Sequence, residues 1–363
     1  MKYDVVGSFL LPERLMDARN QYGMGVIDYH HLHMIEDDAI RLLVEHQLAS
    51  GLEEVTSGEY RRNHWDKDFW FGLGGIRCER VESGRIYQEQ APFTDLLRFT
   101  GRINYNSEHP FFDDFSFLYV ATAGRAHCRQ TIPSPANLYL EILAMTDGHP
   151  EQVYPGAEYL PEDIAGAYNM TIRHLYNLGC RHVQIDDTAC GLLCDDNYTK
   201  RLLQGGVDLI SLHGQFVGLF NDSVADLPAD MDVSLYLSGG DTIVPEWEFL
   251  QYPDNIMPKI LSQVNVDKFF MPFDMGNDYQ FEVLSHVPVG KKVVLGLTDA
   301  HSPCADNTAD IFAAIAKASK YIPQGCLSVS PKTGFKLSSY ASRGLTYEDQ
   351  WKKIAQLRET LCD

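Results

Sequence analysis

Along this chain, short apolar runs alternate with longer stretches in which apolar residues recur every three or four positions. Apolar runs of four to eight residues are typical of buried strands, and a period near 3.6 residues is typical of helices. The predicted strands are residues 5–8, 53–58, 128–132, 182–186, 233–237, 268–273, 293–298 and 326–330. The clearest predicted helices are residues 35–48, 161–178, 215–225, 256–264 and 306–321. Strands that alternate with helices in this way predict an α/β fold, a (β/α)8 TIM barrel.

The length of 363 residues suits one such barrel with insertions. No Pro/Gly/Ser-rich linker or block of like charges divides the chain, so we expect residues 1–363 to form a single domain. Residues 61–114, between the second and third predicted strands, are an insertion rich in aromatic, charged and glycine residues. Insertions after a strand emerge at the active-site face of a barrel. This one is therefore predicted to be a lid or a contact between two copies in a homo-oligomer, with a surface elaboration as the equal alternative.

The charge balance excludes some classes of partner. The chain has 30 Lys plus Arg against 50 Asp plus Glu, a formal net charge of −20, whereas nucleic acids and anionic membranes attract a surplus of basic residues. The hydrophobic content of 45% is enough for a core, and no apolar run approaches the roughly 18 residues of a membrane span. Because Ser8, Pro12 and Glu13 interrupt any apolar core near the start, we expect no signal peptide and a cytoplasmic protein.

The cysteines and clustered histidines give little indication of a metal. The eight cysteines are thinly spread, which is typical of free thiols in an intracellular protein. Only Cys190 and Cys194 lie close together, and no second Cys or His pair is nearby to complete a site. His30, His31 and His33 are more typical of a solvated helix start than of a metal cluster.

Polar residues stand at or just beyond the ends of the predicted strands. The C-terminal ends of barrel strands form one rim, on which active sites lie. We therefore expect side chains from six strands to converge there. They are Ser8, Glu59, Arg61, Gln184, Asp186, Asp187, Tyr236, Ser238, His301 and Thr333.

Five motifs resemble, in the same order, the cobalamin-independent methionine synthase family, most closely its short, single-barrel bacterial members. They cover essentially the whole chain and imply a (β/α)8 barrel. In that family a methyl group passes from a folate to the sulfur of homocysteine, which is held as a thiolate on zinc. The motifs are VGSFLLP (6–12), GEYRR (58–62), TIPSP (131–135), QIDDT (184–188) and LSVSPKTGF (327–335).

The resemblance assigns roles to particular residues. Ser8, Glu59 and Asp186 match the residues that anchor the amino-acid part of homocysteine, and a hydroxyl with two carboxylates suits an α-ammonium group. His301, in the sequence DAHSP, matches a histidine that serves in acid/base chemistry in the long enzymes. No residue can be assigned to folate.

The zinc ligands of the family are a His-x-Cys pair, a glutamate and a distal cysteine. One alignment places the pair at His213, but the better one runs through residues 228–231 and places it at Tyr236 and Ser238. The glutamate then falls on Pro272 and the distal cysteine on Thr333. The resemblance with these replacements implies that the family's zinc site does not form. We predict no metal and assign no cofactor, and whether folate binds stays open.

Three hypotheses follow. The first is a metal-independent enzyme that binds an amino-acid-like or thiol-like small molecule through Ser8, Glu59 and Asp186, with His301 as general acid or base in group transfer or lyase chemistry. Tyr236, Ser238 and Thr333 would line the former metal pocket and hydrogen-bond the substrate. The second is a methionine synthase whose metal is bound by His301, Cys304 or Cys326. The third is a non-catalytic amino-acid-binding homologue.

Two interpretations are open for one pair of arginines. Arg61 and Arg62 either orient a substrate carboxylate through their guanidinium groups or fix the insertion by salt bridges.

Overall fold

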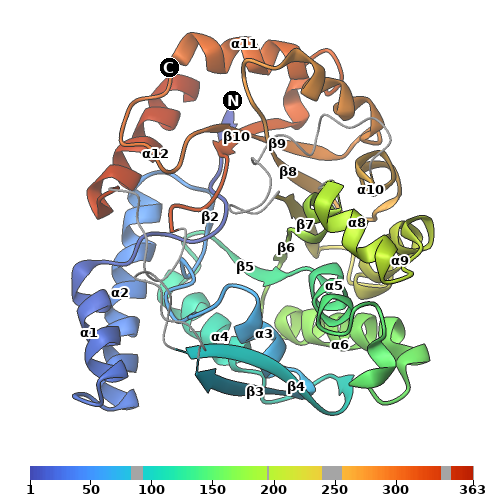
Figure 1. The fold of residues 1–363 in the computed structure, drawn as a ribbon. Coiled ribbons are helices and arrows are strands. Elements are labelled where there is room, and N and C mark those ends of the chain that lie inside the picture. Colours follow the sequence, from blue (N-terminus) through green and yellow to red (C-terminus); the bar gives the residue numbers. More distant parts are fainter. Residues whose placement is uncertain (83–92, 194–195, 239–255, 337–344, 363) are drawn as a thin grey trace.

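The computed structural model describes residues 1–82, 93–193, 196–238, 256–336 and 345–362. Eight strands form one sheet in the order β1-β10-β9-β8-β7-β6-β5-β2, and every neighbouring pair is parallel. The sheet curls, and helices lie around its outside (Figure 1). This confirms the predicted α/β fold of the (β/α)8 type. The strands are β1 (Lys2–Tyr3), β2 (Glu54–Val55), β5 (His127–Pro133), β6 (His182–Asp187), β7 (Asp232–Leu237), β8 (Lys268–Pro272), β9 (Lys292–Thr298) and β10 (Leu327–Pro331).

The first strand does not lie where the apolar pattern placed it. Residues 5–8 were predicted as the strand, but β1 ends at Tyr3 and its hydrogen bonds to β10 end where Asp4 N donates to Val329 O. Gly7, at φ +66°, then turns the chain in a conformation that favours glycine. Val5 and Val6 are buried without belonging to the strand, which explains the misleading apolar run.

The helices of the barrel agree with the predicted ones except at some ends. Residues 215–225 were predicted as a helix, but α9 begins at Leu209, where the Asp208 side chain caps it by accepting a hydrogen bond from Ile210 N. His213 therefore lies inside this helix. The helices are α1 (Glu13–Gly23), α2 (Tyr29–Ala49), α3 (Lys67–Gly72), α4 (Pro110–Thr122), α5 (Pro135–Met145), α6 (Leu160–Asn177), α7 (Ala189–Leu192), α8 (Asp196–Gln204), α9 (Leu209–Ser223), α10 (Met257–Gln263), α11 (Thr308–Ala318) and α12 (Tyr347–Cys362).

The predicted insertion contains a β-hairpin outside the barrel. After α3, strands β3 (Gly74–Glu82) and β4 (Phe93–Asn104) pair antiparallel, and α4 leads back to β5. The hairpin packs beside α6 (Figure 1), where Arg102 forms two hydrogen bonds of 2.6 and 2.7 Å with the Asp163 carboxylate. These contacts hold the hairpin against the outside of the barrel, as expected for a surface elaboration. A role of the insertion as a lid or as a contact between two copies stays a prediction.

Charged side chains inside the barrel connect β1 and β2, the two edge strands of the sheet. The guanidinium of Arg129, on β5, lies 3.0 Å from Asp4 beyond β1 and 3.1 Å from Glu54 on β2, and it donates to Val5 O at 2.6 Å. His182 Nδ1 lies 2.8 Å from Glu54, and the amine of Lys268 lies 3.7 Å from both carboxylates. This cluster of Asp4, Glu54, Arg129, His182 and Lys268 is called the seam cluster below. It joins β1 to β2 through side chains.

An apolar layer separates the seam cluster from the rim. Val6, Tyr236, Phe270 and Val294 form a separate buried cluster. Side chains two residues apart lie on the same side of a strand. Tyr236 therefore lies on the same side of β7 as Ser234, and Phe270 on the same side of β8 as Lys268. Each lies one layer nearer the C-terminal ends of the strands. The next residues in these rows are Ser238 and Pro272, so both lie at the rim.

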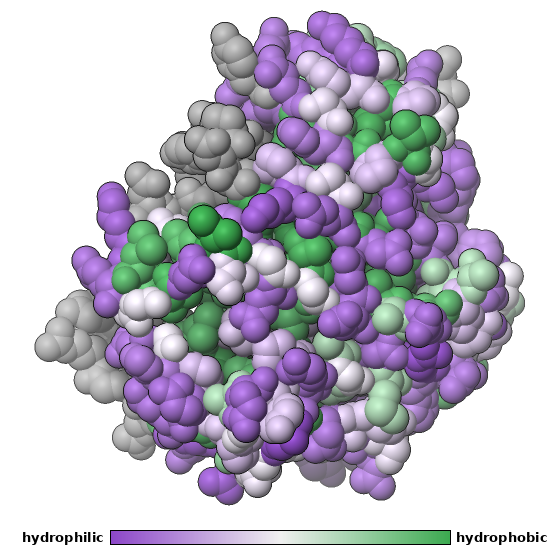
Figure 2. Space-filling model, turned by 90° about the vertical axis from the view of Figure 1, so that its right-hand side faces the viewer, coloured by the Kyte–Doolittle hydropathy of each residue, from purple (hydrophilic) through white to green (hydrophobic). Residues whose placement is uncertain are grey.

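One face of the molecule is mainly hydrophilic (Figure 2). On the face shown in Figure 2, polar residues predominate and hydrophobic ones lie in small patches between them. Among the helices of the described residues, none has the length and apolar character needed to cross a membrane.

Candidate active site

Two loops that lie far apart in the sequence meet at the rim. Ser8, after β1, donates from Oγ to the carbonyl of Lys336 at 3.1 Å, and its own carbonyl accepts from Phe335 N at 2.8 Å. A Cβ at Gly334 would lie 2.6 Å from Ser8 N, so only glycine fits between the two backbones. The segment after β10 is thereby fixed against the segment after β1.

The Glu59 carboxylate is placed by an unusual backbone. Gly58 and Glu59 both have left-handed conformations, with φ +64° and +60°, which is uncommon for a residue other than glycine. Strain of this kind costs of order 1–3 kcal/mol and clusters at functional sites. The Glu59 side chain is buried, accepts from Thr131 Oγ1 at 3.0 Å and lies 3.1 Å from Arg62 Nη1. Glu59 is thus a fixed, buried carboxylate.

Asp186, at the end of β6, is a second buried carboxylate near Glu59. Its Oδ1 accepts from Gln184 Nε2 at 2.6 Å. Burial, together with the negative charge of Glu59, raises the pKa of Asp186 to about 7. A cation that binds here would favour the ionised carboxylate and relieve this cost.

The neighbouring Asp187 has a different task. Its side chain accepts from Ser134 Oγ at 2.5 Å and from Cys190 N at 2.9 Å. Ser134 is the N-cap of α5, so Asp187 links the end of β6 to the helix starts outside the barrel. Successive side chains of a strand face opposite sides, which separates the roles of Asp186 and Asp187.

On the other half of the rim, Tyr236 and His301 contact residues 332–334. Tyr236 Oη donates to the Lys332 carbonyl at 3.0 Å. His301 Nε2 lies 3.3 Å from Thr333 Oγ1 and 3.1 Å from Gly334 O. Since Gly334 also packs on Ser8, the segment after β10 connects His301 and Tyr236 to the Ser8 side of the rim.

Pro272 and Ser238 complete this half. A Cβ at Gly296 would lie 3.1 Å from Pro272 Cα and 3.0 Å from Lys332 Cα, which places Pro272 close to the same segment. Ser238 N donates to Asp187 O at 2.9 Å, which fixes Ser238 directly beyond the end of β6.

Arg61 forms ion pairs within the protein. This residue was a candidate for substrate binding, but its guanidinium is paired with Asp37 and, at 2.6 Å, with Asp114 of α4. It also lies 4.8 Å from the ring centre of Phe117. These are the contacts expected if Arg61 fixes the insertion by salt bridges, and a role of Arg61 in substrate binding stays a prediction.

Arg62 and Lys336 are the basic residues next to the carboxylates. Arg62 contacts Glu59 and donates to Thr131 O at 2.5 Å, while burial lowers the pKa of Lys336 to about 8. Lys336 was not predicted as a site residue. The only signal in the sequence was its place directly after the LSVSPKTGF motif.

The remaining candidates lie elsewhere. His30, His31 and His33 lie within the first five residues of α2, where Asp28 accepts a hydrogen bond from His31 N. Cys190 is buried, whereas Cys194 lies outside the described residues.

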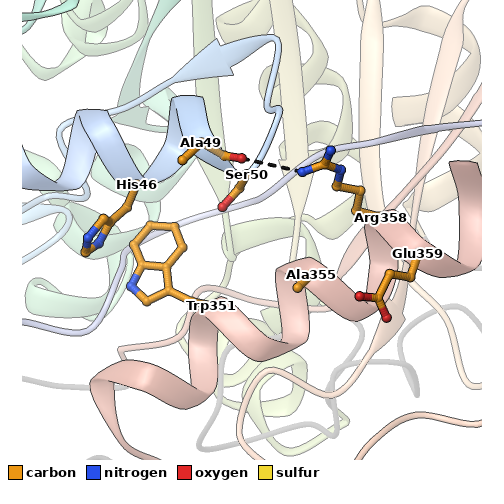
Figure 3. A pocket seen from close by; sticks show the side chains of 7 residues that line it. All are labelled: His46, Ala49, Ser50, Trp351, Ala355, Arg358 and Glu359. Carbon is orange, nitrogen blue, oxygen red and sulfur yellow. Dashed lines mark hydrogen bonds between the residues drawn. The ribbon is translucent and has the colours of Figure 1, made fainter.

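A surface pocket of about 820 Å³ lies at the opposite end of the barrel. His46, Ala49 and Ser50 at the end of α2 face Trp351, Ala355, Arg358 and Glu359 of α12 (Figure 3). Because α2 ends just before β2 begins, this pocket belongs to the N-terminal side of the strands. It contains no predicted site residue.

Comparisons with known proteins bear on these findings. The sequence model described as the catalytic domain of cobalamin-independent synthase matches residues 251–343. The Bacillus subtilis (strain 168) protein YxjG, which is uncharacterized, is 31% identical over 361 residues, which cover 99% of this chain and 93% of YxjG. The chain belongs to the cobalamin-independent methionine synthase family. This confirms the resemblance that the five motifs indicated.

Other relatives agree with membership of the methionine synthase family. A methionine synthase from Saccharolobus solfataricus is 20% identical over 347 residues, 95% of this chain and 90% of that protein. The crystal structure of a putative vitamin-B12-independent methionine synthase from Listeria monocytogenes has a TM-score of 0.75 and 28% identity, covering 99% of this chain and 96% of that one. A B12-independent methionine synthase from Shewanella, with a TM-score of 0.68 and 16% identity, shares the fold over 99% of this chain and 96% of that one.

Proposed function

We propose that this member of the methionine synthase family is a metal-independent enzyme that acts on a small amino-acid-like or thiol-like substrate by group transfer or lyase chemistry. One observation carries the proposal. The rim keeps the buried carboxylates of Glu59 and Asp186 beside Ser8, while Tyr236, Ser238, Pro272 and Thr333 stand where the family's zinc ligands align. The amino-acid end of the site is therefore retained, and the reacting end has changed.

The retained end suits an ammonium group. Glu59 is 5% and Asp186 6% exposed, and neither has a lysine or arginine in ion-pair contact with it apart from Arg62 on Glu59 among the described residues. Two buried carboxylates close together repel each other, as the raised pKa of Asp186 reflects. A bound ammonium group would offset that repulsion and donate hydrogen bonds to both carboxylates.

The residues at the other end do not suit zinc. Proline has no side-chain donor atom, and neutral hydroxyl groups are poor ligands compared with thiolate, imidazole and carboxylate. The Tyr236 hydroxyl is in addition bonded to the Lys332 carbonyl. Hydroxyl groups in this position would instead hydrogen-bond a polar group of the substrate.

One combination within the hypothesis of relocated metal ligands, His301 with Cys326, meets a geometric obstacle. Cys326 precedes β10, whereas His301 follows β9. In a parallel pair these positions lie at opposite ends of the strands, and five residues of strand span about 16 Å. His301 and Cys326 therefore cannot bind one ion.

We expect purified protein dialysed after exposure to zinc to retain fewer than about 0.1 zinc ions per chain by elemental analysis. The matched control restores the family's ligands in one variant, Tyr236→His, Ser238→Cys, Pro272→Glu and Thr333→Cys. Provided that circular dichroism shows this variant folded, it should retain about one zinc per chain. One tightly bound zinc in the wild-type protein would overturn the proposal.

His301 is the proposed general acid or base. We expect His301→Ala to reduce turnover of the substrate by about 100-fold or more while the affinity for the amino-acid end changes less than about twofold. The measurement is single-turnover kinetics with parallel calorimetric titration. His33→Ala, on α2, is the matched control and should change neither. Equal turnover by the wild-type and His301→Ala proteins would remove His301 from catalysis, and failure of the wild-type protein to turn over any member of a panel of amino acids and thiols would favour the non-catalytic homologue.

A further inference from the structure

Lys336 is held at the rim by its backbone. It follows β10 by five residues, and its carbonyl accepts the hydrogen bond from Ser8 Oγ. Phe335, just before it, donates from its backbone N to the Ser8 carbonyl. The position of Lys336 is thus tied to the residue that the family resemblance assigns to the amino-acid end of the ligand.

The amine of Lys336 lies within electrostatic reach of the buried carboxylate. Its side chain is partly buried, and burial lowers the pKa of the amine to about 8. The charge of Glu59 opposes this shift, whereas those of Arg19 and Arg62 add to it. At neutral pH the amine still carries a positive charge, in surroundings that hydrate it only partly.

The other two cations at this place are already engaged. Arg62 is paired with Glu59 and donates to Thr131 O. Arg19 lies 3.1 Å from Glu36 and also binds the Tyr60 carbonyl. Within the described ranges the amine of Lys336 makes neither an ion pair nor a hydrogen bond. A partly buried ammonium group with this free capacity is suited to bind an anion that arrives with a ligand.

The charges at the rim match those of a zwitterion. Glu59 and Asp186 supply negative charge for an α-ammonium group. Lys336, whose backbone carbonyl is bonded to Ser8, supplies a positive charge within electrostatic reach of Glu59. We propose that the Lys336 amine binds the α-carboxylate of the substrate and so restricts the site to free amino acids rather than amines or amides. This inference rests on the proposed function, because it takes the ligand to have an amino-acid end.

The test compares ligands that differ only at the carboxylate. L-Methionine and L-homocysteine are titrated against their primary amides by calorimetry, with the wild-type, Lys336→Met and Lys336→Arg proteins. The wild-type protein should prefer the amino acids by about 10- to 100-fold, the range of one charge-assisted hydrogen bond. Lys336→Met should lose this preference by binding the amino acids more weakly and the amides unchanged. Lys336→Arg should retain part of it.

The control Lys320→Met removes an exposed lysine beyond α11 and should behave as wild type. If Lys336→Met weakens amino acids and amides equally, Lys336 only holds Glu59 in place, and the inference is wrong. An unchanged preference in Lys336→Met would also overturn it while leaving the proposed function intact. If the wild-type protein binds neither the amino acids nor their amides, the proposed function itself fails and the inference with it.

Discussion

Replacing Arg129 by methionine should lower the free energy of unfolding by about 3–5 kcal/mol, the cost of removing one partner from a buried ion pair. Arg129 is 1% exposed and lies within 3.1 Å of both carboxylates of the seam cluster, Asp4 and Glu54. Methionine fills similar space but leaves Asp4 and Glu54 with only Lys268, at 3.7 Å, and His182. The hydrogen bond from Arg129 to the Val5 carbonyl is lost as well. Equilibrium unfolding in urea, followed by circular dichroism, measures the change.

The matched control is Arg98→Met on the hairpin. Arg98 pairs with Glu79, but its side chain is 46% exposed, and exposed ion pairs contribute about 1 kcal/mol or less. A loss in Arg129→Met no larger than that of the control would mean that water replaces the guanidinium in the barrel. The seam between β1 and β2 would then be held by other contacts.

The strands in the middle of the sheet are buried along almost their whole length, and the apolar residues within them marked their positions closely in the sequence. For example, residues 182–186 were predicted as a strand, and β6 is His182–Asp187. The first strand was misplaced because Val5 and Val6 are buried by the core and not by strand pairing. An apolar pattern records burial, and only the turn at Gly7 shows where pairing ends.

Some helices could not be predicted in full because the sequence pattern that marks a helix is weak in them. Eight of the eleven residues of α5 are buried, so this helix has no polar face and no clear 3.6-residue period. The start of α9 was missed because it depends on a cap at Asp208, whereas the apolar period was recognised only from residue 215 onward.

Site residues that lie within a sequence motif could be predicted, whereas those placed only by tertiary contacts could not. Ser8, Glu59 and Asp186 lie in motifs, and the structure places all three at the rim. Arg61 and Arg62 are adjacent in one motif, yet only Arg62 contacts Glu59, because the backbone direction that separates them is set by the left-handed turn at Gly58 and Glu59. Lys336 reaches the site through pairing with a residue 328 positions away, which no local pattern records.

Replacing Asp186 by asparagine should weaken binding of an amino acid by at least about 100-fold, because the ligand ammonium loses a buried, charged partner. The wild-type affinity should also depend on pH. With a pKa of about 7, Asp186 is mainly protonated in the free protein below pH 7, and an ammonium ligand must displace that proton. Affinity should therefore rise as the pH increases from 5.5 to 8, by up to about tenfold per unit below pH 7. In Asp186→Asn the remaining affinity should be nearly independent of pH in this range.

The stability of the free protein should change in the opposite sense. The pKa of Asp186 in the folded protein, about 7, lies above its ordinary value of 3.8. The folded protein therefore binds more protons than the unfolded chain between these two values, and stability decreases as the pH rises through them. Glu36 offers a matched control, since burial raises its pKa to about 7 too, but it lies on α2 between Arg19 and Arg61. Glu36→Gln should flatten part of the stability profile and leave the pH dependence of binding intact. If Glu36→Gln and not Asp186→Asn removed the pH dependence of binding, the ammonium group would bind elsewhere than at Asp186.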